Sequence, residues 1–209
     1  MNANLRSTSA VLGFPRIGPQ REVKKALEAY WGDKISAEEL LKVAKEQRLN
    51  TYATIKEQGV DFVPTGTFSL YDHVLDMSNT LGIIPEAYAK SGLSQLDTYF
   101  AMARGHQKGG VDLPATEMKK WFDSNYHYLV PEFSEKSEFK LNDNKPVDDF
   151  IEAKEAGYNA RPVILGPLTL LWLGKTSKDA QDPNFNRYSL LPKLAQTYVQ
   201  LFEKLAAAG

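Results

Sequence analysis

An order of helix, strand, loop and helix occurs twice in this 209-residue chain, and it constrains the fold more than any other feature. In the first half the residue pattern predicts, in order, a helix over 36–59, a strand over 60–64, a polar loop over 65–69 and a helix over 71–81. In the second half it predicts a helix over 146–156, a strand over 161–165, a turn over 166–169 and a helix that ends near Gly174. Strands that alternate with helices are typical of α/β folds with a parallel sheet.

Two local signals support these helix boundaries. Ser36 and Glu39 have the spacing of a capping box, in which each side chain accepts a hydrogen bond from the backbone N–H of the other residue. Apolar residues recur at three- and four-residue spacing from Leu190 to Leu205 and predict a final helix. The sequence stops at Gly209, where an α/β fold leads from a helix into another strand, so we expect an interrupted fold.

A basic segment near the start is a candidate anion site. The apolar run Val11 to Phe14 predicts a buried strand, and Pro19 suits the first turn of the helix that follows. The backbone N–H groups of that turn, with Arg16, Arg21 and Lys24 beside them, would attract carboxylates or phosphates. On spacing alone an alternative stays open, in which these cations are only the solvent-exposed face of an amphipathic helix.

Composition argues against several classes of partner. The formal net charge is −1 and no basic stripe is interleaved with aromatic residues, so no nucleic-acid partner is expected. No apolar run approaches the roughly 20 residues needed to span a bilayer, so no membrane partner is expected. Residues 1–10 lack the apolar core of a targeting signal, and we expect them to form a disordered tail.

Thiol and metal chemistry are not expected within this chain. Cysteine is absent, which excludes disulfides and thiolate ligands and is consistent with a reducing compartment. His73, His106 and His127 are far apart, and none has the spacing of a metal-binding motif.

Two segments between the repeated halves differ in character. Residues 105–113 contain glycine and lysine and predict a flexible surface loop, to which we assign no chemistry. Residues 117–132 are dense in aromatic and amide side chains, so Asn125 could hydrogen bond a flat polar ring while Trp121 stacks on it. The alternative, that these aromatic side chains belong to the core, stays open.

Four motifs resemble, in the same order, the amino-terminal region of the cobalamin-independent methionine synthases. They are GFPRIGPQREVKKA (13–26), YDHVLD (71–76), KWFDSNYHYLVPEF (120–133) and PVILGPLTLLWLGK (162–175). The resemblance extends from about Val11 to Gly209, and the sequence of residues 147–157 is most like that of the fungal members.

The resemblance implies a cytoplasmic methyltransferase of methionine biosynthesis, which moves a methyl group from 5-methyltetrahydropteroyl-polyglutamate to L-homocysteine without cobalamin. Family members consist of two (β/α)8 barrels, and the carboxyl-terminal barrel holds homocysteine and the zinc ion that activates its thiol. Since such a barrel takes about 250 residues or more, residues 11–209 are expected to be a partial (β/α)8 TIM-type barrel, the amino-terminal portion of the first barrel. The zinc ligands would then lie outside this chain, which alone is expected to be inactive.

The resemblance also assigns substrate binding to four residues. Arg21 and Lys24 match the arginine and lysine of the family's RELK segment, which binds the folate substrate. Lys120 matches the lysine of the family's TKW sequence and is a candidate contact for the polyglutamate tail. Lys119 stands where many members have threonine, and the tryptophan that follows favours Lys120 over it. Asn125 matches a second folate contact, and no residue here is assigned a catalytic or metal-binding role.

Physical chemistry agrees with this assignment, because a polyglutamate tail carries several carboxylates that arginine and lysine side chains bind. Two other functions stay open. One is a folate- or anion-binding α/β module without catalysis. The other is an unrelated α/β enzyme that acts on phosphorylated small molecules, and it leaves the motif at 120–133 unexplained.

Overall fold

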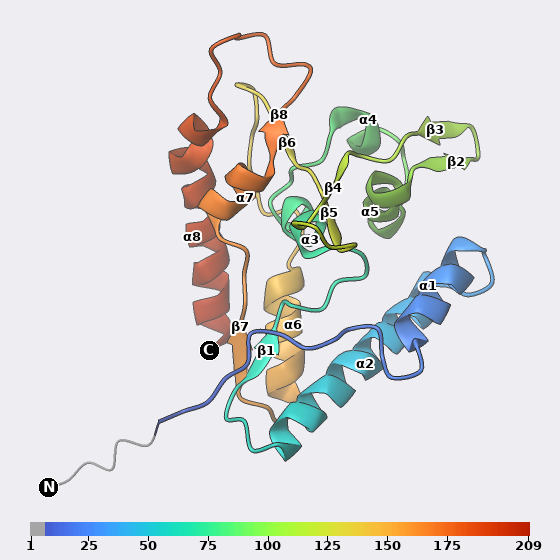
Figure 1. Ribbon diagram of the computed structural model, residues 1–209, viewed down its shortest axis with the longest axis vertical. Coiled ribbons are helices and arrows are strands. Elements are labelled where there is room, and N and C mark those ends of the chain that lie inside the picture. The colour runs from blue at the N-terminus through green and yellow to red at the C-terminus, as the bar shows by residue number, and fades with distance from the viewer. Residues whose placement is uncertain (1–6) are drawn as a thin grey trace, which may run out of the picture. The chain divides into compact units, whose positions relative to one another are not determined.

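A computed structural model describes residues 7–209 and divides the chain into two compact units. Unit 1 contains the chain up to Leu70 together with Pro146–Ile164, and unit 2 contains Tyr71–Lys145 together with Leu165–Gly209. Each unit combines helices with short strands, and Figure 1 labels them. The mixed α/β class expected from the sequence is therefore confirmed.

The elements of unit 1 are α1 (Glu22–Trp31), α2 (Ala37–Glu57), β1 (Val63–Thr65), α6 (Lys145–Glu155, of which Lys145 falls in unit 2) and β7 (Ala160–Pro162). Strands β1 and β7 pair in parallel, with Val63 opposite Ala160. A cluster of buried side chains from α2, β1 and α6 forms a core beside this pair: Tyr52, Ile55, Val63 and Ala153.

Helix α2 is fixed at its start and along its length. The predicted capping box is confirmed, since Ser36 Oγ accepts from Glu39 N at 3.2 Å and the Glu39 carboxylate accepts from Ser36 N at 2.7 Å. Further along, the Arg48 guanidinium donates to both carboxylate oxygens of Glu152 on α6, at 2.7 and 2.9 Å. The Asp149 carboxylate lies 3.7 Å from Arg48 Nε. A partly buried ion pair with two hydrogen bonds therefore joins α2 to α6.

Unit 2 contains helices α3 (His73–Thr80), α4 (Glu86–Ala89), α5 (Gln95–Arg104), α7 (Pro167–Leu173) and α8 (Leu191–Ala208), with the 3-10 helix η1 (Arg187–Leu190) before α8. Its strands form two antiparallel hairpins, β2 (His106–Lys108) with β3 (Val111–Leu113) and β4 (Met118–Lys120) with β5 (His127–Leu129). A parallel pair joins β6 (Glu132–Phe133) to β8 (Lys175–Thr176).

The structure corrects the prediction of a strand over Val11–Phe14. Only Ala10 forms an isolated parallel bridge, with Phe62, and the Leu12 side chain is 76% exposed. Gly13 and Pro15 account for the failure, because glycine weakens extended structure and proline lacks the N–H that a ladder requires. Ser9 is already ordered, and its backbone N–H donates to Asp61 Oδ2 at 2.8 Å. The rest of the predicted tail, residues 1–6, lies outside the described residues.

Other boundaries also differ from the prediction. Residues 105–113 form the β2–β3 hairpin, which turns at Gly109 and Gly110 with positive φ angles, rather than a loop. The strand predicted over 60–64 lies instead at Val63–Thr65, with Pro64 at its centre. Helices α4 and α5 were not predicted. Ser94 caps α5 by accepting from Asp97 N at 3.1 Å, a signal that the sequence contains.

The strands of residues 7–209 form four separate two-stranded sheets and no closed barrel. Two of the four, β1–β7 and β6–β8, are parallel, as α/β architecture requires. In this described part of the chain, no helix is both long and apolar enough to cross a membrane.

Replacement of Arg48 tests how much the α2–α6 ion pair stabilises the fold. Arg48→Leu leaves the buried Asp149 carboxylate and the partly buried Glu152 carboxylate beside an apolar group, and we expect the free energy of unfolding in urea to fall by about 3 kcal/mol. Lys45→Ala is the control, because Lys45 Nζ lies 3.9 Å from Glu152 with its side chain 58% exposed. That change is expected to stay within about 0.5 kcal/mol. Equal losses in the two variants would contradict the assignment.

Candidate functional site

The first candidate region is the amino terminus of α1 in unit 1. Arg21 is the N-cap residue, and its backbone is left-handed, with φ 63° and ψ 36°. Arg21 N donates to Gly18 O at 3.1 Å, which closes a turn with Pro19 at its second position. This turn explains why the helix begins at Glu22 and not at Pro19 as predicted. A left-handed arginine costs roughly 1–2 kcal/mol, so the surrounding structure holds Arg21 in place against a local preference.

The side chains of Arg21 and Lys24 are exposed, Arg21 as the N-cap residue and Lys24 in the first turn of α1. Lys24 also has Glu28 within 3.5 Å at the next turn, where both side chains are more than half exposed. An ion pair this exposed is weak, and it leaves the Lys24 ammonium accessible to a ligand. The Arg21 and Lys24 side chains thus both face solvent.

The backbone donors of this turn are less available than the sequence suggested. Val23 N donates to Ile17 O at 3.1 Å, and the Glu22 carboxylate accepts from Gln20 N at 3.0 Å. The prediction of free N–H groups is therefore wrong at Val23, because the preceding loop folds back onto the helix. Any anion bound here would rely on the side chains of Arg21 and Lys24.

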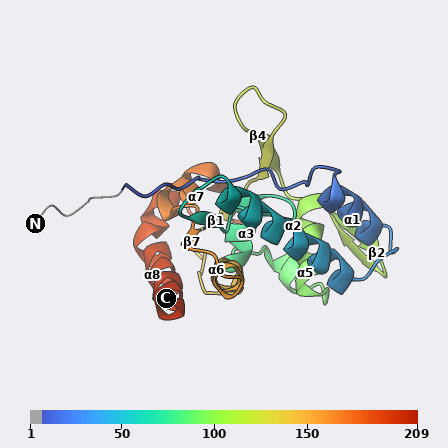
Figure 2. The same cartoon turned by 90° about the horizontal axis from the view of Figure 1, so that it is seen from below.

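The second candidate region is the β4–β5 hairpin of unit 2, which carries Lys120 and Asn125. In Figure 2 its loop extends as a narrow finger from β4. Lys120 pairs with His127 and Lys119 pairs with Tyr128. Successive strand residues point to opposite faces, so Lys119 and Lys120 lie on different sides of the hairpin. Only one of them can share a face with His127, and that residue is Lys120.

The tip of this hairpin is ordered by its own hydrogen bonds and yet is largely exposed. Trp121 N donates to Tyr126 O at 2.8 Å, and Ser124 N donates to Trp121 O at 3.1 Å. Phe122 has a left-handed φ of 49° and is 91% exposed, and Tyr126 is 80% exposed. Asn125 is also exposed. These aromatic side chains are not core residues, whereas Tyr128 of β5 is buried.

A buried polar network lies at the start of α3, next to this hairpin. The Asp72 carboxylate accepts from three backbone N–H groups, those of Val74 at 3.1 Å, Leu75 at 3.0 Å and Leu129 at 2.9 Å. Tyr99 OH accepts from Asp72 N and donates to Asp76 Oδ1 at 2.6 Å. Burial raises the pKa of the Asp72 carboxyl, while the three backbone donors act in the opposite direction.

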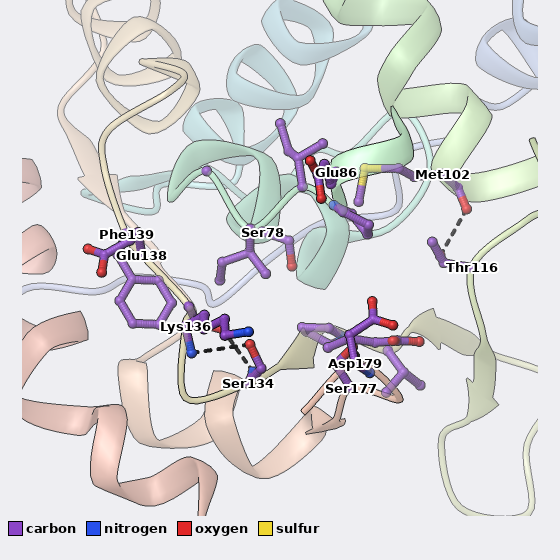
Figure 3. Close-up of a pocket in the computed structure, with 18 of the residues that line it drawn as sticks. Ser78, Glu86, Met102, Thr116, Ser134, Lys136, Glu138, Phe139, Ser177 and Asp179 are labelled. Carbon is purple, nitrogen blue, oxygen red and sulfur yellow. Dashed lines mark hydrogen bonds between the residues drawn. The ribbon is translucent and has the colours of Figure 1, made fainter. Parts of the chain in front are cut away.

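Unit 2 also contains a cavity of about 770 Å³, drawn in Figure 3. Hydroxyl groups and carboxylates are frequent in its lining, which includes Ser78, Glu86, Ser134 and Asp179. Figure 3 shows Ser78 and Glu86 across the opening from Ser134. None of the four predicted binding residues lines this cavity. Its acidic groups disfavour a polyanionic tail, so it is not our candidate site.

Comparison with known proteins shows which family this chain belongs to. A family model described as "Cobalamin-independent synthase, N-terminal domain" matches residues 8–209, which is nearly the whole chain. The chain belongs to this family. This match confirms the resemblance inferred from four sequence motifs. The two α/β units described above together form the matched amino-terminal domain.

Similar proteins carry the name of a complete enzyme. The chain is 55% identical over 207 residues to the probable 5-methyltetrahydropteroyltriglutamate–homocysteine methyltransferase of Schizosaccharomyces pombe. It is 53% identical to the protein so named in Saccharomyces cerevisiae, and both matches cover 96% of this chain. A Flavobacterium johnsoniae protein of the same name is 49% identical over 93% of the chain. The chain spans only 27%, 27% and 25% of these relatives' lengths.

Within this amino-terminal domain the four predicted residues fall into two pairs. Arg21 and Lys24 are close together in unit 1, and Lys120 and Asn125 are on one hairpin in unit 2. Among residues 7–209 no group of three or more histidine, cysteine, aspartate or glutamate side chains could hold a metal ion.

The hydrogen-bond network around Asp72 was not predicted from the sequence. Asp72 before an apolar helical pattern has the residue type of an N-cap, and that local signal was present in the sequence. Its bond to Leu129 joins positions 57 residues apart, and no local pattern predicts such a contact.

Replacement by glycine of Arg21, the N-cap residue of α1, and of Lys25 within α1 tests whether the backbone at Arg21 is strained. Arg21→Gly relieves the left-handed conformation, whereas Lys25→Gly puts glycine into the helix interior. Both variants lose one exposed cation, so their charge effects match. We expect Arg21→Gly to exceed Lys25→Gly in free energy of unfolding by about 1–2 kcal/mol. Equal values in urea denaturation would show that Arg21 is not strained.

Proposed function

We propose that this chain is the folate-binding amino-terminal part of a methyltransferase that moves a methyl group from 5-methyltetrahydropteroyltriglutamate to L-homocysteine. The observation that carries the proposal is the 55% identity, across 96% of the chain, to a relative named for that reaction. The substrates, the cytoplasmic location and the activity of the whole protein are part of this proposal.

The division of roles follows from the chemistry of the described residues. Arg21 and Lys24 present two cations to solvent at the amino terminus of α1, and Lys120 presents another on the β4–β5 hairpin. A triglutamate tail carries several carboxylates, and charge-assisted hydrogen bonds from such cations suit it. The Asn125 amide both donates and accepts hydrogen bonds, so it suits a pterin or amide edge.

The finer architecture belongs to the same proposal. The parallel pairs β1–β7 and β6–β8 would be parts of a (β/α)8 barrel that sequence beyond residue 209 completes. The zinc ion that would activate the homocysteine thiol requires ligands that residues 7–209 do not supply. The contribution of this domain is then to bind and orient the methyl donor, which lowers the barrier through proximity.

Lys24→Ala tests the role of the cationic pair. We expect the affinity for the triglutamate substrate to fall by about five- to ten-fold, because a charge-assisted contact is lost. Affinity for the monoglutamate form should change far less, since it lacks most of the tail. Lys25→Ala, an exposed neighbour on α1, is the matched control and should leave both affinities unchanged. Equal losses for the two ligands in calorimetric titration would contradict a tail contact at Lys24.

Asn125→Ala should behave differently from Lys24→Ala. If Asn125 contacts the part of the ligand that both forms share, the triglutamate and monoglutamate affinities fall by a similar factor of about five. Asp123→Ala, at the same exposed hairpin tip, serves as the control. An unchanged titration for Asn125→Ala would make this residue a structural part of the hairpin.

The proposed division of labour also concerns turnover. Residues 1–209 alone, supplied with zinc and both substrates, should give no methionine, because the proposal assigns zinc binding and homocysteine activation to another part of the protein. Methionine formation by this segment, followed by mass spectrometry, would overturn the division.

A further inference from the structure

Three consecutive residues at the start of α3 contact the hairpin that carries Lys120. Tyr71 OH lies 3.3 Å from His127 Nε2, and the two rings meet edge to face with centroids 5.6 Å apart. Asp72 Oδ2 accepts from Leu129 N at 2.9 Å. His73 stacks on Trp121 with a centroid separation of 6.0 Å and an interplanar angle of 4°. We call residues 71–73 the clamp segment.

These contacts surround Lys120 on the hairpin. His127 is the cross-strand partner of Lys120, and Trp121 is the next residue along the chain. Leu129 pairs with Met118 at the other end of the short ladder. The clamp segment thus contacts the residue opposite Lys120, the residue after it and the base of its hairpin. Lys120 itself is exposed and is not part of these contacts.

The clamp segment is itself firmly anchored. The Asp72 side chain is only 3% exposed, and two further backbone N–H groups fix it at the start of α3. Tyr99 OH on α5 accepts from the backbone N–H of Tyr71 at 3.1 Å. A carboxylate with three N–H donors cannot shift without leaving buried donors unpaired, which is costly.

We propose that the clamp segment positions Lys120 for the folate tail, with Asp72 as the main positioning residue. A hairpin of three residue pairs is only marginally ordered by its own ladder. Contacts to α3 restrict its motion before the ligand arrives, so less entropy is lost on binding. This inference rests on the proposed function, since it assumes that Lys120 contacts the tail.

Asp72→Ser separates the two roles of this side chain, which are to cap α3 and to hold the β4–β5 hairpin through Leu129. Serine at an N-cap still accepts a hydrogen bond from the first turn of α3, but it is too short to keep the bond to Leu129 as well. We expect the affinity of the full gene product for 5-methyltetrahydropteroyltriglutamate to fall about five-fold. The Leu129 amide should also exchange with solvent faster, while amides of the β2–β3 hairpin stay unchanged.

A double-mutant cycle with Lys120→Ala distinguishes positioning from a general structural effect. If Asp72 acts through Lys120, Asp72→Ser causes almost no further loss of affinity once Lys120 is alanine. His73→Ala, which removes the stack on Trp121 from a side chain that is 49% exposed, should show the same dependence on Lys120 and is the fallback if Asp72→Ser does not fold. Ser94→Ala removes the N-cap of α5 and is the matched control, with no change in affinity expected.

Each outcome of the cycle has a definite reading. Additive losses from Asp72→Ser and Lys120→Ala would overturn the positioning role, because they would show that the clamp segment acts independently of Lys120. Faster exchange at Leu129 with unchanged affinity would also overturn it. If Lys120→Ala alone leaves triglutamate binding unchanged, the tail contact in the proposed function fails, and the inference falls with it. That single variant therefore distinguishes the two failures.

Discussion

In each unit of this chain, one short parallel strand pair connects two stretches that are far apart in sequence. Unit 1 consists of two stretches of chain, and β1 and β7 join them. Unit 2 also consists of two stretches, and β6 and β8 join those. The pairs contain three and two residue pairs, so few backbone hydrogen bonds hold segments that are far apart in sequence. Side chains next to each pair must supply the remaining stabilisation.

Different side chains do this in the two units. In unit 1 the Arg48–Glu152 pair connects α2, which precedes β1, to α6, which precedes β7. In unit 2 Lys175 of β8 forms ion pairs with Glu132 of β6 and with Glu117. Gly174, just before β8, packs so closely that an added Cβ would lie 2.8 Å from Pro131 O. Glycine is required there because β6 and its neighbours leave no room for a side chain.

Much of the helical structure could be predicted because its signals are local. Ser36 and Glu39 place the start of α2 through contacts three residues apart, and Gly166 with Pro167 marks the start of α7. The strands were harder, because β1 depends on a partner almost one hundred residues away and includes a proline that local rules place at its end. The run at Val11–Phe14 has strand composition but forms no ladder, and the bridge next to it belongs to Ala10. Apolar composition therefore indicates strands only where a pairing segment exists.

The candidate site divides in the same way. Arg21, Lys24, Lys120 and Asn125 could be selected from the sequence because family resemblance works position by position. The local environments of these residues could not be predicted, because the turn at Gly18–Arg21 and the hydrogen bond between Leu129 N and Asp72 form only in the folded chain. The sequence also left Lys119 and Lys120 as competing candidates. The register of β4 with β5 separates them onto opposite faces.

Magnitudes explain why positioning matters more here than the number of charges. Ion pairs between exposed side chains contribute about 0–1 kcal/mol each, because water screens them and the long side chains lose entropy. An exposed cation such as Lys120 would thus bind a flexible tail weakly if it were free to move. Tight binding requires that this entropy be lost during folding and not during association. In the proposal, the contacts of the clamp segment with the β4–β5 hairpin restrict Lys120 before the ligand arrives. In this proposal the interactions that decide affinity are therefore the buried ones behind the cations.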